Sequence, residues 1–491
     1  MNSKAFIFLL IMSGIAQAQT GRVIYVPGST VKISQLVGDY DRERQTATLN
    51  VTDTRYHLWG TDLGVPFRHH GRTYLLFGDT IGPPGGDAIA YTTDTDPEDG
   101  LELTFVHDAS GMYKPVQIPG VSQRDFEVPM EGVSVGGRMY IYHTTDHSNS
   151  VTMGRSVVAA SDDDGQTFEY LYDFSTQHFI NVSVVEVDLA QWGGFPQQTG
   201  QGLVIFGSGR YRQSDVRLAF QPADSIESAQ SLRYFTGLDP AGLPQWSARE
   251  EDAASLFSQP CVGELSVSYN RFLHKWFMLY NCDNPRGINF RTADRPWGPW
   301  SVPQLLFDPW LDGGYCHFMH TSWQFRHCDA VHDPGRENEW GGEYGPYQFE
   351  DLATGNDSTT TIYFTMSTWN PYTVVLMKST LKLPGLPASV DSKKSQSLPK
   401  QFVLRQNYPN PFNPTTEILY DLPRTSHVTL TIFNVLGEKV RILENGEKSV
   451  GRHHVLWDGR DEQNRAVSSG VYFYRIEADD FVAVKKMIFL E

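Results

Sequence analysis

The sequence has little that would hold it in a membrane or draw it to a polyanion. After residues 1–18, no run approaches the roughly 20 consecutive apolar residues that span a bilayer, so nothing suggests a transmembrane anchor. Basic residues are outnumbered, with 40 Lys and Arg against 57 Asp and Glu and a formal net charge of −17. Phosphate binding relies on clustered cations, so nucleic acid and anionic membranes are disfavoured as partners. A neutral substrate fits better, although such acidity also simply keeps a secreted protein in solution.

Helical patterns are scarce as well. Apolar residues rarely recur with a period of 3.6, and short runs rich in Val, Ile, Tyr, Phe and Trp instead alternate with clusters of Gly, Pro, Asn and Asp. With 28 Phe, 23 Tyr and 11 Trp, the 491 residues can fill a sizeable core. The sequence therefore predicts an ordered, mainly β protein.

The N-terminus has the pattern of a secretory signal. Within residues 1–18, Lys4 supplies the positive start, AFIFLLIMSGIA the apolar stretch, and Ala16-Gln17-Ala18 the small-residue cleavage site. The mature chain is expected to begin near Gln19. We therefore expect the protein to be exported.

Cysteines are few, and all four lie in the second half of the chain. An even number in an exported protein favours two disulfides over a metal site. If residues 262–282 form a hairpin that turns at Arg271 and Phe272, the first two cysteines face each other across it, which leaves the other two as the second pair. The predicted pairs are Cys261 with Cys282 and Cys316 with Cys328.

A change of composition near residue 383 separates two domains. Residues 383–400, LPGLPASVDSKKSQSLPK, are poor in aromatics and predict a solvated linker. In residues 401–491, alternation and turn residues every 8 to 12 positions predict a small β-sandwich. The motifs YPNPFNP, NVLGEKV, WDGRD and SSGVYFYRI resemble the immunoglobulin-like sorting domain of proteins exported by the bacterial type IX system. The resemblance implies a sorting function without catalysis, and the type IX machinery as a partner.

The large domain, residues 22–382, divides into strand–turn–strand units. Five irregular four-stranded blades fit its length, so we predict a five-bladed β-propeller. A plain β-sandwich with long insertions is the alternative, because the units are unevenly spaced. Residues 161–168, SDDDGQTF, match the structural Asp-box turn of propeller blades, without the Arg triad of a sialidase. The units begin near Asp62, Glu131, Asn181, Glu264 and Glu343.

Two aspartates interrupt apolar, strand-like runs. A hairpin centred on HHGR, residues 69–72, makes Asp62 in GTDLG and Asp79 in FGDT direct partners, with Cβ atoms roughly 4.5 to 5.5 Å apart. Such a pair raises one pKa, leaving one acid and one carboxylate near neutrality, the combination that glycoside hydrolysis uses. The alternative is structural: Asp62 as an Asx-turn residue and Asp79 bonded to amides at a strand end.

The expected separation of the two carboxyl groups bears on stereochemistry. Facing positions near 5 Å suggest the roughly 5 to 5.5 Å of retaining enzymes. Strand twist, and a bulge favoured by Gly60, Gly64 and Gly78, would splay the strands and leave room for a water. By analogy with five-bladed furanosidases, many of which invert, we expect inversion.

The large domain resembles the family labelled domain of unknown function 4185. The resemblance covers most of residues 55–380, and members are classed as glycoside hydrolases, endo-D-arabinanases acting on mycobacterial arabinogalactan and lipoarabinomannan. It would place the two catalytic aspartates on Asp62 and Asp79. VPMEGVSVGGRMYIYH departs from the expected P-x-G start, so Glu131 would alter the subsites. Beyond GTDLG and FGDT, the motifs are FGSGRYRQSDVRLAF (206–220), VGELSVSYN with KWFMLYN (262–281), GPWSVP (298–303) and GGEYGPY with FTMSTWNPYTVVLM (341–377).

Six further residues are predicted to bind substrate. The two Glu open inner strands and would accept sugar hydroxyls, unless they are rim residues bonded to backbone. The two Arg flank Tyr211 in a mix suited to sugars, unless they form ordinary salt bridges. The two Trp would stack on a furanose, unless they belong to the core. The six are Glu131, Glu264, Arg210, Arg212, Trp59 and Trp369.

A histidine-rich stretch invites a metal, but its spacing matches no zinc pattern, so neither metal nor cofactor is predicted. The stretch holds His317, His320, His327 and His332 with Asp329 and Asp333.

These patterns lead to one function and one alternative. We expect a monomeric glycoside hydrolase, endo-D-arabinanase-like, that cleaves a furanose-rich polysaccharide and is secreted or attached to the cell surface after passing through the periplasm. The alternative is a carbohydrate-binding propeller without catalysis, displayed by the sorting domain. A binding protein would not need opposed carboxylates.

Overall fold

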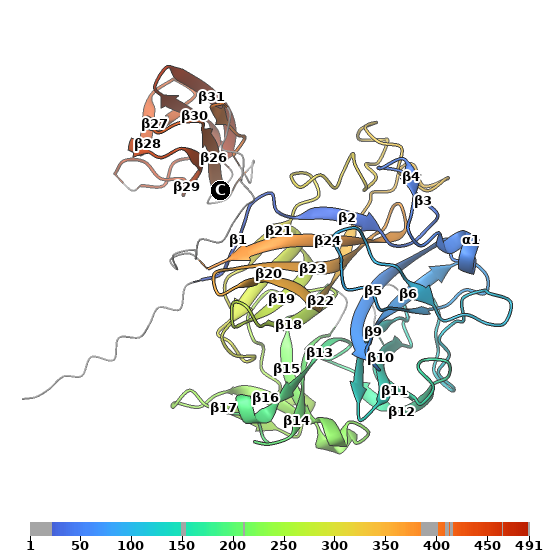
Figure 1. Ribbon diagram of the computed structural model, residues 1–491. Helices are drawn as coiled ribbons and strands as arrows, with labels where there is room; N and C mark the ends of the chain where they lie inside the picture. Colours follow the sequence, from blue (N-terminus) through green and yellow to red (C-terminus); the bar gives the residue numbers. More distant parts are fainter. Residues whose placement is uncertain are drawn as a thin grey trace, which may run out of the picture. The chain divides into compact units, whose positions relative to one another are not determined.

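The computed structural model describes residues 22–148, 154–209, 212–383, 401–407, 412, 416–463 and 465–489 (Figure 1). The predicted secretory signal, Arg210 and nearly all of the predicted linker lie outside these residues. The chain divides into two compact units, residues 1–388 and 389–491. The described part is all-β, as predicted. No helix in it is long and apolar enough to cross a membrane.

Antiparallel sheets build the N-terminal unit, and in the first four of them the strand order follows the chain. The first three sheets are β5 (Gly60–His69), β6 (Arg72–Ile81), β7 (Ala88–Thr92) and β8 (Thr104–Phe105); β9 (Pro129–Val135), β10 (Arg138–Thr145), β11 (Arg155–Ser161) and β12 (Glu169–Ser175); and β13 (Asn181–Asp188), β14 (Gln201–Ser208), β15 (Arg217–Pro222), β16 (Arg233–Leu238) and β17 (Pro244–Ser247).

The next two sheets complete the series. They are β18 (Leu265–Asn270), β19 (Lys275–Asp283), β20 (Arg286–Ala293) and β21 (Gln304–Phe307); and β22 (Glu343–Asn356), β23 (Thr359–Thr368) and β24 (Thr373–Lys382) with β1 (Ile24–Tyr25) and β2 (Val31–Gln35). Short elements lie between the strands: the hairpin of β3 (Tyr40–Asp41) and β4 (Thr46–Ala47), helix α1 (Thr52–Tyr56), and the 3-10 turns η1 (Leu189–Gln191), η2 (Ala223–Ser225), η3 (Ala229–Ser231) and η4 (Glu250–Asp252).

The first strands of the sheets contact one another in a closed cycle. β5 contacts β9, β9 contacts β13, β13 contacts β18, β18 contacts β22, and β22 returns to β5 (Figure 1). The sheets therefore form a ring. Its last sheet is completed by the start of the unit, because both β1 and β2 pair with β24.

Apolar runs in the second strands follow from this packing. A strand in the middle of a sheet that is covered on both faces has no solvent side, so its sequence is continuously apolar rather than alternating. Tyr74 to Phe77 in β6 and Met139 to Tyr142 in β10 are almost fully buried. The Asp-box turn between β11 and β12 is structural, as expected: Asp163 accepts hydrogen bonds from the backbone and hydroxyl of Thr167, at 2.8 and 2.6 Å.

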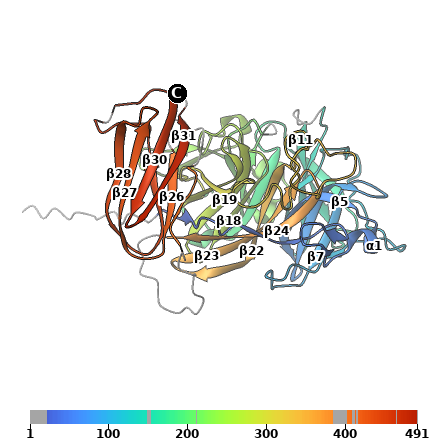
Figure 2. The same cartoon turned by 90° about the horizontal axis from the view of Figure 1, so that it is seen from above.

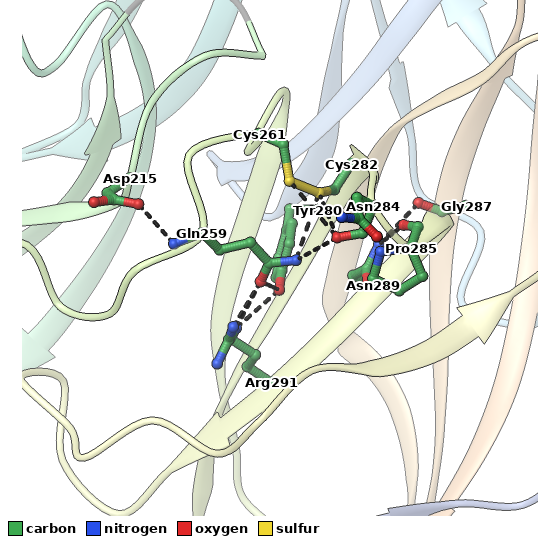
Figure 3. The surroundings of a disulfide bond; sticks show 10 residues. All are labelled: Asp215, Gln259, Cys261, Tyr280, Cys282, Asn284, Pro285, Gly287, Asn289 and Arg291. Atoms are coloured by element: carbon green, nitrogen blue, oxygen red, sulfur yellow. Dashed lines mark hydrogen bonds between the residues drawn. A yellow bond between two sulfur atoms is a disulfide. The ribbon is translucent and has the colours of Figure 1, made fainter. Parts of the chain in front are cut away.

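Both predicted disulfides are present, Cys261 with Cys282 and Cys316 with Cys328. The predicted register behind the first is wrong. Asn270 pairs with Lys275, so the turn comprises residues 271–274, and Cys261 lies before β18 rather than opposite Cys282. Beside this disulfide, the Gln259 side chain accepts hydrogen bonds from Tyr280 and Arg291 and holds the segment that carries Cys261 against β19 and β20 (Figure 3).

The C-terminal unit consists of two sheets around one apolar core that includes Trp457 and Tyr474. One sheet has β25 (Val403–Leu404), β26 (Thr416–Leu422) and β29 (Gly451–Trp457); the other has β28 (Lys439–Lys448), β27 (Ser426–Asn434), β30 (Gly470–Ala478) and β31 (Phe481–Phe489) (Figure 2). Most of the YPNPFNP motif lies outside the described residues.

Candidate active site

Asp62 lies at the start of β5, where the strand is irregular. The register of β5 against β6 shifts between Gly60 and Asp62 and again between Leu63 and Val65, so the predicted bulge is present. Because of these shifts Asp62 pairs with Gly78 and not with Asp79, and the predicted direct facing of the two aspartates is wrong by one residue. A Cβ at Gly78 would lie 2.8 Å from Asp62 Oδ1 and 2.6 Å from Val128, so only glycine fits beside this carboxyl group.

Asp79 follows Gly78 with a positive φ of 42°. The bulge and this left-handed residue turn the side chain of Asp79 into the surroundings of Asp62, although the two are not strand partners. Burial raises the pKa of Asp79 to about 8, and the charge of Asp62 adds to the rise. Burial likewise raises the pKa of Asp62 to about 7. Two interacting carboxyl groups titrate as a pair, and between their macroscopic pKa values they share one proton.

Two tyrosines from the last sheet hold Asp62. Tyr344, the second residue of β22, donates its hydroxyl to Asp62 Oδ2 at 3.0 Å. Tyr372, in the turn before β24, also hydrogen-bonds the carboxyl group, and both bonds favour its ionised form. The pKa of Tyr372 lies well above its usual value because it is buried beside the aspartates, so it stays a donor. Neither tyrosine was predicted from the sequence, although GGEYGPY and NPYT contain them.

A buried aspartate–histidine pair, Asp87 and His143, lies against the backbone of Asp79. Asp87 Oδ1 accepts the backbone N–H of Asp79 at 3.1 Å, and Asp87 Oδ2 lies 2.8 Å from His143 Nε2. His143 Nδ1 lies 2.6 Å from the carbonyl oxygen of Thr144, which only accepts, so Nδ1 carries a proton. The charge of Asp87 contributes to the raised pKa of Asp79. Neither residue was predicted.

The carboxylate of Glu131 accepts hydrogen bonds from other groups of the protein. Its Oε2 accepts the Ser183 hydroxyl at 3.1 Å and the Val184 backbone N–H at 3.0 Å, and its Oε1 accepts the N–H of Gly132. Burial raises its pKa to about 7. These bonds link β9 to β13, which corresponds to the backbone-bonded alternative and not to the predicted binding of sugar hydroxyls.

Glu264 and Arg212 lie near Asp62, and Arg212 contacts Tyr344, which bonds Asp62. Arg212 Nη2 is 3.7 Å from Glu264 Oε2, and its guanidinium stands 5.7 Å from the centre of the Tyr344 ring. The charge of Glu264 contributes to the raised pKa of Asp62. Arg212 and Glu264 thus form an ion pair, and they also belong to the surroundings of the candidate acid–base pair, Asp62 and Asp79.

Trp59 and Trp369 are surface residues, 56% and 42% exposed, and not core residues. Trp59 stands just before β5 and, with Tyr372, lines a cavity of about 210 Å³. Trp369 donates its indole N–H to Glu339 at 3.1 Å, with Arg336 stacked on the ring at 4.7 Å. Tyr372 thus lines the cavity beside Trp59 and also bonds Asp62.

Possible metal ligands gather elsewhere. In the described residues, His69 Nε2 and His70 Nδ1 both contact Asp164 Oδ1, at 3.0 and 2.9 Å, at the far end of β5 from Asp62. A second group combines Asp329 with Cys316 and Cys328, whose sulfurs form a disulfide. Neither group includes a member of the carboxyl pair.

Comparison with known proteins adds two family matches. A model described as Domain of unknown function (DUF4185) matches residues 47–378, and one described as FlgD Ig-like domain matches residues 412–480. No curated protein matches the chain. Among solved structures, a GH43_1 enzyme from Xanthomonas citri is 13% identical, covering 66% of this chain and 88% of its own, with a TM-score of 0.37. A xylan beta-1,4-xylosidase from Bacillus halodurans is 7% identical, covering 88% and 90%, with a TM-score of 0.36. At these TM-scores the likeness carries no functional argument.

Proposed function

The chain belongs to the first of these families, whose description leaves the chemistry open, and from the site we propose that it is a glycoside hydrolase with Asp62 and Asp79 as its acid–base pair. The observation that carries the proposal is the buried, electrostatically coupled pair of carboxyl groups. With both pKa values raised toward neutrality, the pair holds one proton and one negative charge between its two macroscopic pKa values.

The surroundings of each carboxyl group favour a division of roles. Tyr344 and Tyr372 stabilise the ionised form of Asp62, which then acts as the base. Asp79, with the higher pKa, acts as the acid. Asp79 donates its proton to the glycosidic oxygen as the bond to the anomeric carbon breaks, while Asp62 takes a proton from the attacking water. The products are two shorter glycans, one with a new reducing end of inverted configuration.

The substrate we propose is a furanose-rich polysaccharide, cut within the chain as by an endo-D-arabinanase. A neutral glycan suits a protein of net charge −17. The ring of sheets, with Asp62 at the start of a first strand, supports a five-bladed propeller that carries its site at one mouth. Arg212, Glu264, Trp59 and Trp369 would contact the substrate; Arg210, outside the described residues, stays in this set as a prediction.

We also propose that the protein works as a monomer outside the cytoplasm. Two disulfides fit an oxidising compartment. The two-sheet C-terminal unit and its match to an Ig-like domain support an immunoglobulin-like sorting domain over residues 401–491, read by the type IX machinery after a signal peptide at residues 1–18.

The test pairs Asp62→Asn and Asp79→Asn with the control Asp357→Asn, which lies in the exposed turn between β22 and β23. Purified proteins are incubated with D-arabinan, L-arabinan and other glycans, and product sizes are followed. Each site variant should lose about 100-fold or more in kcat, because an acid or base contributes that much, while the control keeps its rate. Proton NMR of the first product reports its configuration.

The same experiment separates the enzyme from a carbohydrate-binding propeller. A binding protein would bind a glycan without releasing product, and its affinity would survive both substitutions. Full turnover in either Asp→Asn variant would assign that residue a structural role.

A further inference from the structure

Phe126 has a backbone conformation that its side chain does not favour. It lies in the loop between β8 and β9 with a φ of 69°, in the left-handed region. For a bulky residue that region costs roughly 1–2 kcal/mol, whereas glycine adopts it freely. The ring is 44% exposed and is not among the residues of the apolar cores.

The chain on both sides fixes this conformation. Glu127, next in sequence and almost fully buried, accepts the backbone N–H of Arg124 at 2.7 Å and that of His147 at 2.9 Å. The carbonyl of Val128 accepts the backbone N–H of Thr144 at 2.9 Å, and the N–H of Val128 donates to the Thr144 hydroxyl at 2.9 Å. The loop therefore cannot relax around Phe126.

The result of this conformation is a contact with the candidate acid. The backbone N–H of Phe126 points at the carboxyl group of Asp79, 3.0 Å from Oδ1 and 3.1 Å from Oδ2. Any residue would supply that N–H, and glycine would supply it without strain. The contact with Asp79 thus explains the backbone of Phe126 but not its ring.

We propose that the ring of Phe126 is a sugar-stacking subsite beside Asp79, which binds the apolar face of a neutral glycan ring next to the bond that is cleaved. An exposed aromatic ring buries the C–H face of a sugar and needs no charge to do so. Trp59 flanks the same end of the hairpin, since its backbone N–H bonds the carbonyl of Ile81, two residues after Asp79. The backbones of Phe126 and Trp59 are therefore both close to the candidate acid. This inference rests on the proposed function.

The test separates the ring from the backbone. Phe126→Gly keeps the N–H and removes both ring and strain, and Phe126→Trp restores an aromatic face. The matched control is His274→Gly, because His274 also has a positive φ, 52°, in the exposed turn between β18 and β19. Kinetics use the full chain with D-arabinan and L-arabinan, and calorimetry uses arabinofuranose hexasaccharides of both series in an Asp62→Asn background.

Both glycine variants should melt at a higher temperature than the wild type. Only Phe126→Gly should raise KM and weaken hexasaccharide binding, each about 10-fold, with kcat changed less than threefold, and Phe126→Trp should recover most of the affinity. Unchanged KM and affinity in Phe126→Gly would overturn the subsite while leaving the proposed hydrolase intact. A fall in kcat with an altered pH profile but unchanged affinity would make Phe126 only a positioning residue for Asp79. If the wild type neither binds nor cleaves any glycan, both proposals fail.

Discussion

Asp62 and Asp79 depend on burial for their chemistry, and the dependence on pH follows from it. Hydrolysis requires one protonated and one ionised carboxyl group, so kcat/KM should follow a bell-shaped curve with its maximum near neutral pH. The fall on the alkaline side reflects loss of the proton from the acid, whose pKa is raised to about 8. Asp87→Asn removes a charge that raises that pKa, and should move the alkaline fall to lower pH. An alkaline limb that stays in place in this variant would contradict the assignment of Asp79 as the acid.

The same pKa shifts predict how stability varies with pH. A carboxyl group whose folded-state pKa lies above its unfolded value of 3.8 binds protons on folding, so its stabilising contribution is complete below that value and is lost as pH rises through the folded pKa. At pH 9 the wild type buries a negative charge on Asp79, which the Asp79→Asn variant lacks. We expect the melting temperature of the variant, relative to the wild type, to rise between pH 4 and pH 9 by about 2 °C or more. Asp357→Asn, in an exposed turn, should show no such trend in differential scanning fluorimetry.

At the scale of strands, close approach between neighbouring sheets depends on glycine. A Cβ on Gly132 in β9 would lie 2.4 and 2.5 Å from the Phe67 ring in β5. Gly132→Ala should therefore cost about 1–3 kcal/mol through overpacking, seen as a lower denaturation midpoint. Gly193→Ala is the control, because nothing lies within 4 Å of that position. Adding Phe67→Leu to Gly132→Ala should restore part of the loss, and additive losses would show that the two residues do not meet.

The strands also show which structural features could be predicted from the sequence. Apolar runs and turn residues predicted the all-β class, the two cysteine pairs and the bulge near Gly60 and Gly64. They did not predict that this bulge moves Asp79 out of register with Asp62, since a shift of one residue depends on the whole hairpin. Tyr344, Tyr372 and His143 were missed because each reaches the site from another sheet or a distant turn, and tertiary contacts of that kind leave no local pattern.

At the scale of the whole chain, the two units have separate cores, Leu404 to Phe489 forming one of them. A protein comprising residues 22–383 should therefore fold alone, melt at the temperature of the corresponding transition of the full chain, and keep its kcat and KM. In the native host, a chain that keeps the predicted signal at residues 1–18 but lacks residues 401–491 should accumulate in the periplasm, because the proposed sorting domain is absent. Calorimetry and fractionation measure both outcomes. Aggregation of the truncated protein would mean that the units share stabilising contacts.

The pairing of β1 and β2 with β24 sets an order in time. These are the first strands to be synthesised, yet Val31 finds its partner Lys378 only after nearly the whole unit has been made. Closing a loop costs roughly 0.6 kcal/mol more for each doubling of its length, so the pairing of β1 and β2 with β24 forms late, after the local hairpins. Until then β24 has a free edge, which is open to pairing with a second chain. Folding must therefore protect an unfinished ring, and pairing of the short segment from Ile24 to Gln35 with β24 removes the free edge.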